Sequence, residues 1–106
     1  MRVLIYAGDV DFICNWIGNK AWTKALPWSG HKEFSSATDE NWVYTDAQNP
    51  STPAKVGGLA RSAKAASGEG SLTFLQVYEA GHMVPMDQPA AALALLNGFL
   101  TNKPFY

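Results

Sequence analysis

Two short apolar runs, one near each end of the chain, constrain the fold most. Val3-Leu4-Ile5-Tyr6 is followed closely by Gly8, and Leu72-Thr73-Phe74-Leu75-Gln76-Val77-Tyr78 stops at Ala80-Gly81. Short runs rich in β-branched and aromatic residues, bounded by glycine, are typical of strands that are covered on both faces in a parallel sheet. The two runs therefore predict two buried strands.

A helical pattern follows each predicted strand. From about Asn15 to Leu26 the sequence suits a helix, with Asn15 as N-cap and Pro27 beyond its end. Pro89 can begin a second helix without losing a hydrogen bond. Both helices have a predicted apolar face. In the first it consists of Ile17, Ala21 and Ala25, and in the second of Ala92, Leu93, Leu96, Phe99 and Leu100.

The middle of the chain, at about 29–70, has few apolar anchors and is rich in Ser, Thr, Gly, Pro and Ala. It predicts an irregular insertion that holds the most mobile backbone, with a short strand possible at Trp42-Val43-Tyr44 and an exposed turn at Asn49-Pro50-Ser51-Thr52-Pro53. The resulting order of strand, helix, insertion, strand and helix is typical of an open α/β sheet. Ligands and catalytic groups of such sheets lie beyond the carboxyl ends of the strands.

Charge and cysteine content exclude several classes of function. The net charge is −1 and charged residues make up 16% of the chain, so we expect neither a nucleic acid nor a membrane as partner. The apolar runs are shorter than the ~20 residues of a membrane-spanning helix. Cys14 is the single cysteine, no Cys-x-x-Cys or His-x-x-x-His pair occurs, and His31 has only Glu33 close by. We therefore expect no disulfide, no metal site and no other cofactor.

Three polar side chains follow the predicted strands: Asp9 and Asp11 after the first, and His82 after the second. Adjacent parallel strands would bring Asp11 and His82 together. A carboxylate on Nδ1–H fixes the tautomer of an imidazole and leaves Nε2 free to act as a general base. By position alone, two unrelated surface residues remain the alternative. Asp9 suits a structural role, since an Asp at such a turn commonly accepts backbone N–H groups.

The sequence segments around these residues indicate a function more specifically than the positions of the residues do. They are Tyr6-Ala7-Gly8-Asp9-Val10-Asp11-Phe12-Ile13-Cys14-Asn15-Trp16, Gly18-Asn19-Lys20-Ala21-Trp22 and Gly81-His82-Met83-Val84-Pro85-Met86-Asp87-Gln88-Pro89. In this order and separation they closely resemble segments of the serine carboxypeptidase family, of the carboxypeptidase Y and cathepsin A type. The likeness covers roughly the first and last thirds of the chain.

The resemblance implies that residues 1–106 form the C-terminal portion of an α/β-hydrolase domain, with a variable insertion at about 29–70. It implies a triad in the order Ser, Asp, His, in which Asp11 is the acid and His82 is the base. The enzymes of this family remove C-terminal residues from peptides and proteins through an acyl-serine. Cys14, Asn15 and Met83 resemble residues at the substrate pocket.

The nucleophile is the part of the triad that the chain lacks. No Gly-x-Ser-x-Gly word occurs, and Ser67-Gly68-Glu69-Gly70-Ser71 has the wrong spacing and is predicted to be a loop. We expect the serine to lie in a missing N-terminal part of the same enzyme, so that this chain alone is inactive and prone to associate with itself. Arg2 and Arg61 are expected on solvated faces rather than on a substrate carboxylate.

Two alternatives stay open from sequence: another α/β-hydrolase such as an esterase, or an inactive piece with a structural or binding role. Localisation in a lysosome or vacuole, or secretion, is an expectation from the resemblance only.

Overall fold

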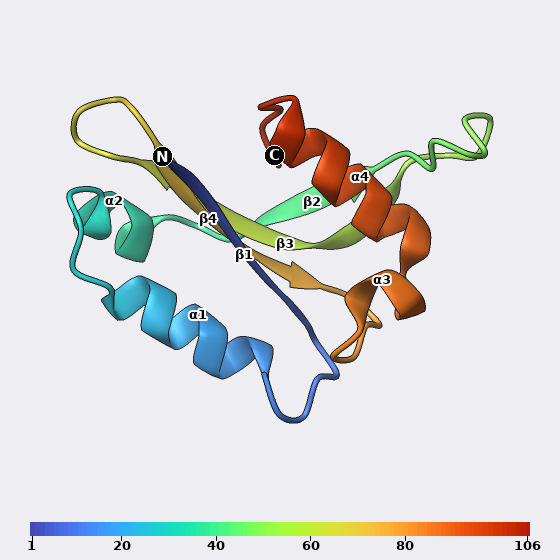
Figure 1. The fold of residues 1–106 in the computed structure, drawn as a ribbon, viewed down its shortest axis with the longest axis horizontal. Helices are drawn as coiled ribbons and strands as arrows, with labels where there is room; N and C mark the ends of the chain where they lie inside the picture. Colours follow the sequence, from blue (N-terminus) through green and yellow to red (C-terminus); the bar gives the residue numbers. More distant parts are fainter.

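A four-stranded mixed sheet with helices on both faces forms the centre of the computed structural model, which describes residues 1–106 (Figure 1). The elements in chain order are β1 Arg2–Gly8, α1 Trp16–Ala25, α2 His31–Ser36, β2 Glu40–Tyr44, β3 Lys55–Lys64, β4 Ser71–Val77, α3 Val84–Asp87 and α4 Pro89–Leu100. The predicted α/β class is confirmed. No helix is long and apolar enough to cross a membrane.

The two strands predicted from the apolar runs are neighbours in this sheet. Its order is β1-β4-β3-β2, and β1 pairs with β4 in parallel from Arg2 opposite Ser71 to Gly8 opposite Val77. The two strands therefore end level with each other. Every residue from Leu72 to Val77 is buried, as expected for a strand covered on both faces. The other edge of β1 has no strand beside it.

The middle of the chain is regular, so the prediction of an irregular insertion is wrong. It contains α2, β2 and the ten-residue strand β3, which pairs antiparallel with both β2 and β4. The sheet is accordingly mixed rather than all parallel. Small residues suit β3 because its neighbours are close: a Cβ atom at Gly58 would lie 1.8 Å from the Gln76 carbonyl oxygen. Pairing with strands on both sides, rather than apolar content, stabilises β3.

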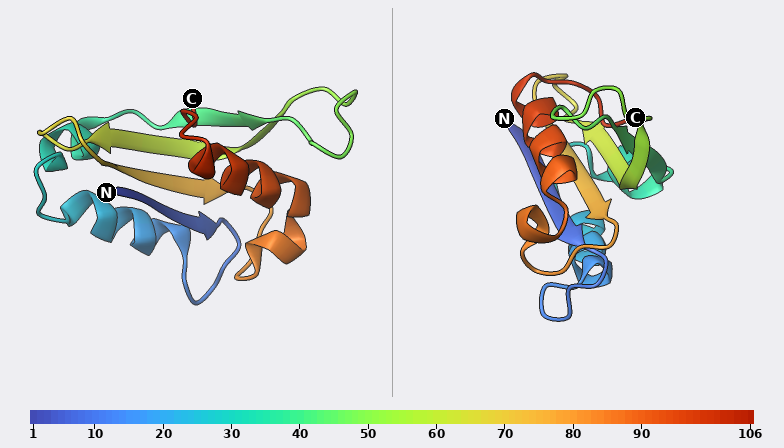
Figure 2. Two further views of the ribbon diagram at one scale, coloured as in Figure 1. Left: turned by 45° about the horizontal axis from the view of Figure 1, so that its top comes forward. Right: turned by 90° about the vertical axis from the view of Figure 1, so that its right-hand side faces the viewer.

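Helices lie on both sides of the sheet (Figure 2), and an apolar cluster forms on each of its two faces. On one face α3 and α4 pack through Val84, Ala91 and Leu95 against β4 and the neighbouring strands. On the other face α2 contributes Phe34, and Trp16 of α1 packs at the edge of the same cluster. The sheet is thus the middle one of three layers.

The bounds of α1 and α4 agree with the sequence prediction, but their buried faces do not. Asn15 caps α1, with Oδ1 accepting from the Gly18 N–H at 2.8 Å. Ile17, however, is 63% exposed, whereas Thr23 is fully buried. The Thr23 hydroxyl tolerates burial because it donates within the helix to the Asn19 and Lys20 carbonyls.

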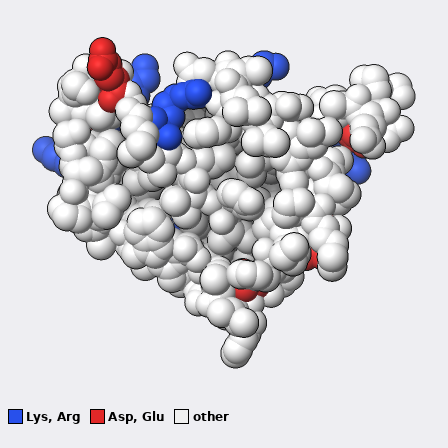
Figure 3. Space-filling view, in the orientation of Figure 1, with Lys and Arg blue, Asp and Glu red and all other residues white.

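In α4, Ala91 and Leu95 face the sheet, whereas Leu93, Leu96 and Leu100 are exposed. This helix is apolar on all sides, so periodicity could not identify the inner face. The face of the molecule that carries α4 is also largely uncharged (Figure 3). An exposed leucine row on a helix is typical of a surface that another segment of protein covers.

A network of charged side chains joins α1 and α2 to β3. Asp39 accepts from Lys20 and, at 2.9 Å, from Arg61 Nε. Arg61 also donates to the carbonyls of Phe34 and Ser35 at 2.9 and 3.1 Å. Arg61 is therefore buried, contrary to the solvated position expected from sequence. Burial alone would raise the pKa of Asp39, but the bonds and charges of Lys20 and Arg61 outweigh it and hold the pKa below the ordinary 3.8.

Asp39→Asn is expected to destabilise the chain by about 2 kcal/mol at pH 7, because the buried Arg61 loses its counter-charge. A carboxyl with a lowered pKa stabilises the fold above its unfolded-state pKa. This contribution is lost as the pH falls below 3.8 through the lower folded-state value. Urea unfolding at pH 7 and near pH 3 measures both effects. Glu69→Gln, in the exposed β3–β4 loop, is the matched control. A variant with wild-type stability at pH 7 would contradict the prediction.

Candidate active site

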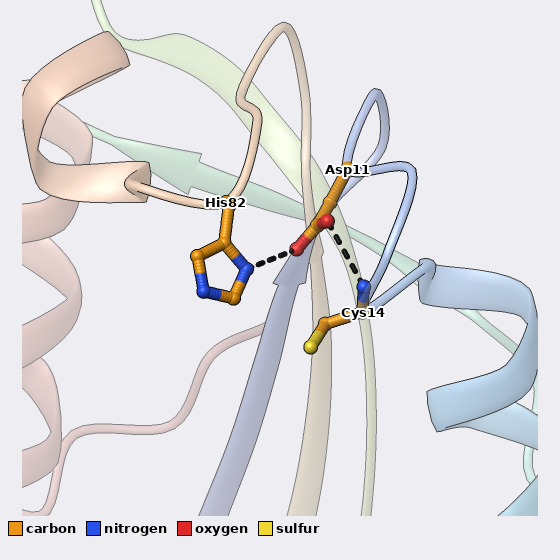
Figure 4. A group of neighbouring side chains, drawn as sticks. All are labelled: Asp11, Cys14 and His82. Atoms are coloured by element: carbon orange, nitrogen blue, oxygen red, sulfur yellow. Dashed lines mark hydrogen bonds and ion pairs between the residues drawn. The ribbon is translucent and has the colours of Figure 1, made fainter.

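Asp11 and His82 meet just beyond the carboxyl ends of β1 and β4. His82 Nδ1 lies 3.0 Å from Asp11 Oδ2, although the two residues are 71 positions apart in the sequence (Figure 4). The parallel pairing of β1 with β4 places their connecting loops side by side. The proximity predicted from the sequence is therefore confirmed as geometry.

The Asp11 carboxylate is held in place by the turn that it begins. Its Oδ1 accepts from the backbone N–H groups of Ile13 and Cys14, both at 3.0 Å, and this leaves Oδ2 for His82. Burial alone would raise the pKa of Asp11, but the His82 hydrogen bond, the Cys14 N–H and the charge of His82 keep it below the ordinary 3.8. Asp11 is consequently ionised at neutral pH.

The His82 side chain is buried far less than its partner: its exposed fraction is 62%, against 5% for the Asp11 side chain. Its Nε2 atom points away from the carboxylate (Figure 4). An imidazole that donates Nδ1–H to a carboxylate carries its lone pair on Nε2. The arrangement can therefore accept a proton from a group that approaches on the exposed side.

Asp9 joins the two loops that carry the site. Its Oδ1 accepts from the Glu79 N–H at 2.8 Å, where Glu79 has the left-handed φ of 53°. This confirms the structural interpretation of Asp9. The loops also touch through backbone, since a Cβ atom at Gly8 would lie 2.0 Å from the Ala80 carbonyl oxygen. Only glycine permits this approach.

Asp87 makes a contact with the loop that carries His82, and sequence reasoning missed it. Its Oδ2 accepts from the Gly81 N–H at 2.7 Å, directly before His82. The bond ties α3 back onto the loop and restricts the backbone on which the imidazole sits. Asp87 lies in the segment Gly81–Pro89, which resembles the family, so the sequence did contain a signal for it. Its spacing from His82 alone indicated no role.

A sequence model of the family described as "Serine carboxypeptidase" matches residues 1–102. The chain belongs to the serine carboxypeptidase family. Among curated relatives it is 50% identical over 103 residues to Carboxypeptidase Y homolog A of Emericella nidulans, and 48% identical over 103 residues to that of Aspergillus niger. Each match covers 97% of this chain but only 17% of the relative, so the chain spans about a sixth of the length of these proteins.

The three residues of this carboxypeptidase-family chain that were predicted to bind substrate differ in exposure and in hydrogen bonding. Cys14 is exposed, and its thiol lies close to both Asp11 and His82. Met83 is 59% exposed and directly follows the histidine. Asn15, by contrast, uses its side-chain oxygen to cap α1. Substrate contact by these residues stays a prediction, and for Asn15 the carbonyl group of the side chain is already engaged.

The glycine-rich segment around Ser67 is a loop, as predicted. It connects β3 to β4, with Gly68 and Gly70 at positive φ, and so lies at the end of β4 opposite to His82. His31 begins α2, where Nδ1 lies 3.1 Å from the Leu26 carbonyl oxygen. Neither segment of this carboxypeptidase-family chain contributes to the Asp11–His82 pair.

Proposed function

We propose that this chain supplies the base and its orienting carboxylate to a serine carboxypeptidase with an α/β-hydrolase fold. The complete enzyme removes C-terminal residues from peptides and proteins by hydrolysis of an acyl-enzyme. The observation that carries the proposal is the 3.0 Å contact between His82 Nδ1 and Asp11 Oδ2 at the carboxyl ends of two parallel strands. Membership of the family supports it.

In this mechanism His82 acts twice. Nε2 takes the hydroxyl proton of the attacking serine and then returns a proton to the leaving amine, and the same base later activates the water that hydrolyses the acyl-serine. Asp11 keeps the ring proton on Nδ1 and stabilises the imidazolium that forms. The Cys14 thiol lies near the imidazole and Met83 directly follows His82 in the sequence, and both would line the pocket beside the scissile bond.

The nucleophilic serine would come from the part of the enzyme that precedes this chain. Three features support a large covering partner. β1 has a free edge, Phe12 and Ile13 beside Asp11 are 94% and 82% exposed, and Leu96 and Leu100 project from α4. Unpaired edges and exposed apolar groups favour contact with more protein. Residues 1–106 would then be the C-terminal part of one hydrolase domain, in a vacuolar, lysosomal or secreted enzyme.

The proposal is tested by a chimera in which this chain replaces the corresponding segment of the Emericella nidulans relative. We expect the chimera to react stoichiometrically with a serine-directed fluorophosphonate and to hydrolyse a blocked dipeptide. The isolated chain should do neither, because a base without a nucleophile has nothing to activate. Labelling and turnover by the isolated chain would contradict the proposal, as would a folded chimera that the reagent does not label. Turnover of esters without peptides would indicate an esterase.

A further inference from the structure

A cleft of about 500 Å³ lies at the opposite end of the strands from His82, and its size is typical of small-molecule sites. The start of β1 and β4 and the end of β3 form its floor, and the end of α4 with the tail that follows it forms a wall. β1 and β4 each span seven residues, so roughly 20 Å separate the cleft from the Asp11–His82 pair. The proposed hydrolysis does not use this cleft.

Three positive side chains line the cleft, and no acidic one does. They are Arg2, Lys64 and Lys103, and none of them forms an ion pair. Glu69, the only acidic residue of the adjoining β3–β4 loop, is not part of the lining. Lys and Arg side chains stand along the upper edge of the molecule in Figure 3, where Figure 1 places the start of β1 and the end of α4. Uncompensated positive charge around a concave surface concentrates anions from solution.

The strand register places two of these charges in one row of the sheet. Arg2 is opposite Ser71, and Ser71 is opposite Lys64. Residues directly opposite on neighbouring strands share a face, so the three side chains project to the same side. Strands lie about 4.8 Å apart, which puts the backbones of the two cations roughly 10 Å apart with a hydroxyl between them. Both long side chains can reach one anion held over Ser71.

Arg2 is fixed in position by the end of α4. Its Nη1 donates to the Phe99 carbonyl at 2.7 Å and to Asn102 Oδ1 at 3.0 Å. The guanidinium also lies over the Phe99 ring, 5.0 Å from the ring centroid. A guanidinium carries five N–H groups, so those on Nε and Nη2 remain for a ligand. An oriented guanidinium fork matches the geometry of a phosphate group.

Part of the cleft wall is apolar. It consists of Phe99 together with Pro104 and Phe105 of the tail that follows α4. The Tyr106 hydroxyl donates to the Ser62 carbonyl at 3.3 Å and so joins the end of this tail to β3. Cationic groups beside an apolar wall suit a ligand that carries its charge on an apolar body.

We propose that the cleft is a binding site for a small organic dianion, a phosphate monoester with a compact apolar body. The phosphate lies over Ser71 between Arg2 and Lys64, and the apolar body packs against Phe99 and Phe105. A phosphate monoester has three terminal acceptor oxygens and a charge of about −1.5 to −2 at pH 7, so it can accept from both cations and the hydroxyl at once. A carboxylate offers two oxygens and a single charge.

Nuclear magnetic resonance titration of the isotope-labelled chain with phenyl phosphate tests the site. We expect saturable shifts of the Ser71 and Lys64 backbone amides, and no shift at Gly81 beside His82. Phenol carries the same ring without the charge and should cause no saturable shift. Inorganic phosphate should bind more weakly than phenyl phosphate, because it has no ring to contact the wall. This comparison of three ligands uses only the wild-type chain.

Lys64→Gln should weaken phenyl phosphate binding by about tenfold, the scale of one charge-assisted hydrogen bond. Lys32→Gln is the matched control, because Lys32 is an equally exposed lysine on α2 and outside the cleft. It should bind as the wild type does. The proposal is overturned if phenyl phosphate causes no saturable shift, or binds no more tightly than phenol or inorganic phosphate. Equal affinities of Lys64→Gln and Lys32→Gln would overturn it as well.

Discussion

His82→Ala in the chimeric enzyme is expected to lower kcat by about 10⁶-fold, the largest effect of any substitution in this chain. The imidazole is the only base that the structure places beside Asp11, and its Nε2 faces the exposed side where a serine would approach. Without it the serine proton has no acceptor and the leaving amine has no donor. The KM should change far less, because the ring contributes to proton transfer rather than to substrate binding.

The measurement is steady-state hydrolysis of a blocked dipeptide, together with the rate of labelling by fluorophosphonate. His31→Ala is the matched control, since His31 begins α2 and lies outside the site. It should retain the kcat of the parent chimera. A loss of only about tenfold in His82→Ala would assign the base to another residue and end the proposed role of this chain.

Asp11→Asn is expected to lower kcat by about 10⁴-fold while the fold stays intact. The local hydrogen bonds explain why an isosteric change is so harmful. Asp11 Oδ1 accepts two backbone N–H groups, so the asparagine oxygen should remain there and its NH₂ group should take the place of Oδ2, facing His82. The amide would then donate to Nδ1 and place the ring proton on Nε2. In this tautomer the ring cannot accept the serine proton.

Nuclear magnetic resonance of the His82 ring distinguishes this explanation from simple loss of charge. The variant should show the proton on Nε2, whereas the parent should show it on Nδ1 at a pH where the ring is neutral. The amide–ring contact should survive as a hydrogen bond, so the unfolding midpoint should change little. Wild-type tautomer with wild-type kcat in Asp11→Asn would contradict the assignment of Asp11 as the orienting carboxylate.

Much of the site could be predicted because its parts are local. A strand followed by a polar turn is a short-range signal, and two such units in parallel place their turns at one edge of a sheet. Asp11 and His82 each lie a few positions after a strand that the apolar runs identify. Their meeting therefore depended on a single assumption, that the strands were parallel neighbours. The roles assigned to them depend in addition on the surrounding sequence segments, which resemble the family.

What only the tertiary structure decided are the features that arise from pairing between distant segments. β3 is a strand because β2 and β4 flank it, and its glycines and alanines carry no sign of this in isolation. The inner face of α4 depends on what packs against it, because every side of that helix is apolar.

The same reason explains Arg61 and Cys14. A buried arginine is stable only where Asp39 and two carbonyls surround it, and these come from other elements. The approach of the Cys14 thiol to His82 likewise exists only after the β1 and β4 loops meet. The sequence by itself determined β1 and β4, the bounds of α1 and α4, and the two triad candidates, since periodicity and short local motifs encode them. Long-range packing decided the rest, because a contact between distant residues leaves no local pattern.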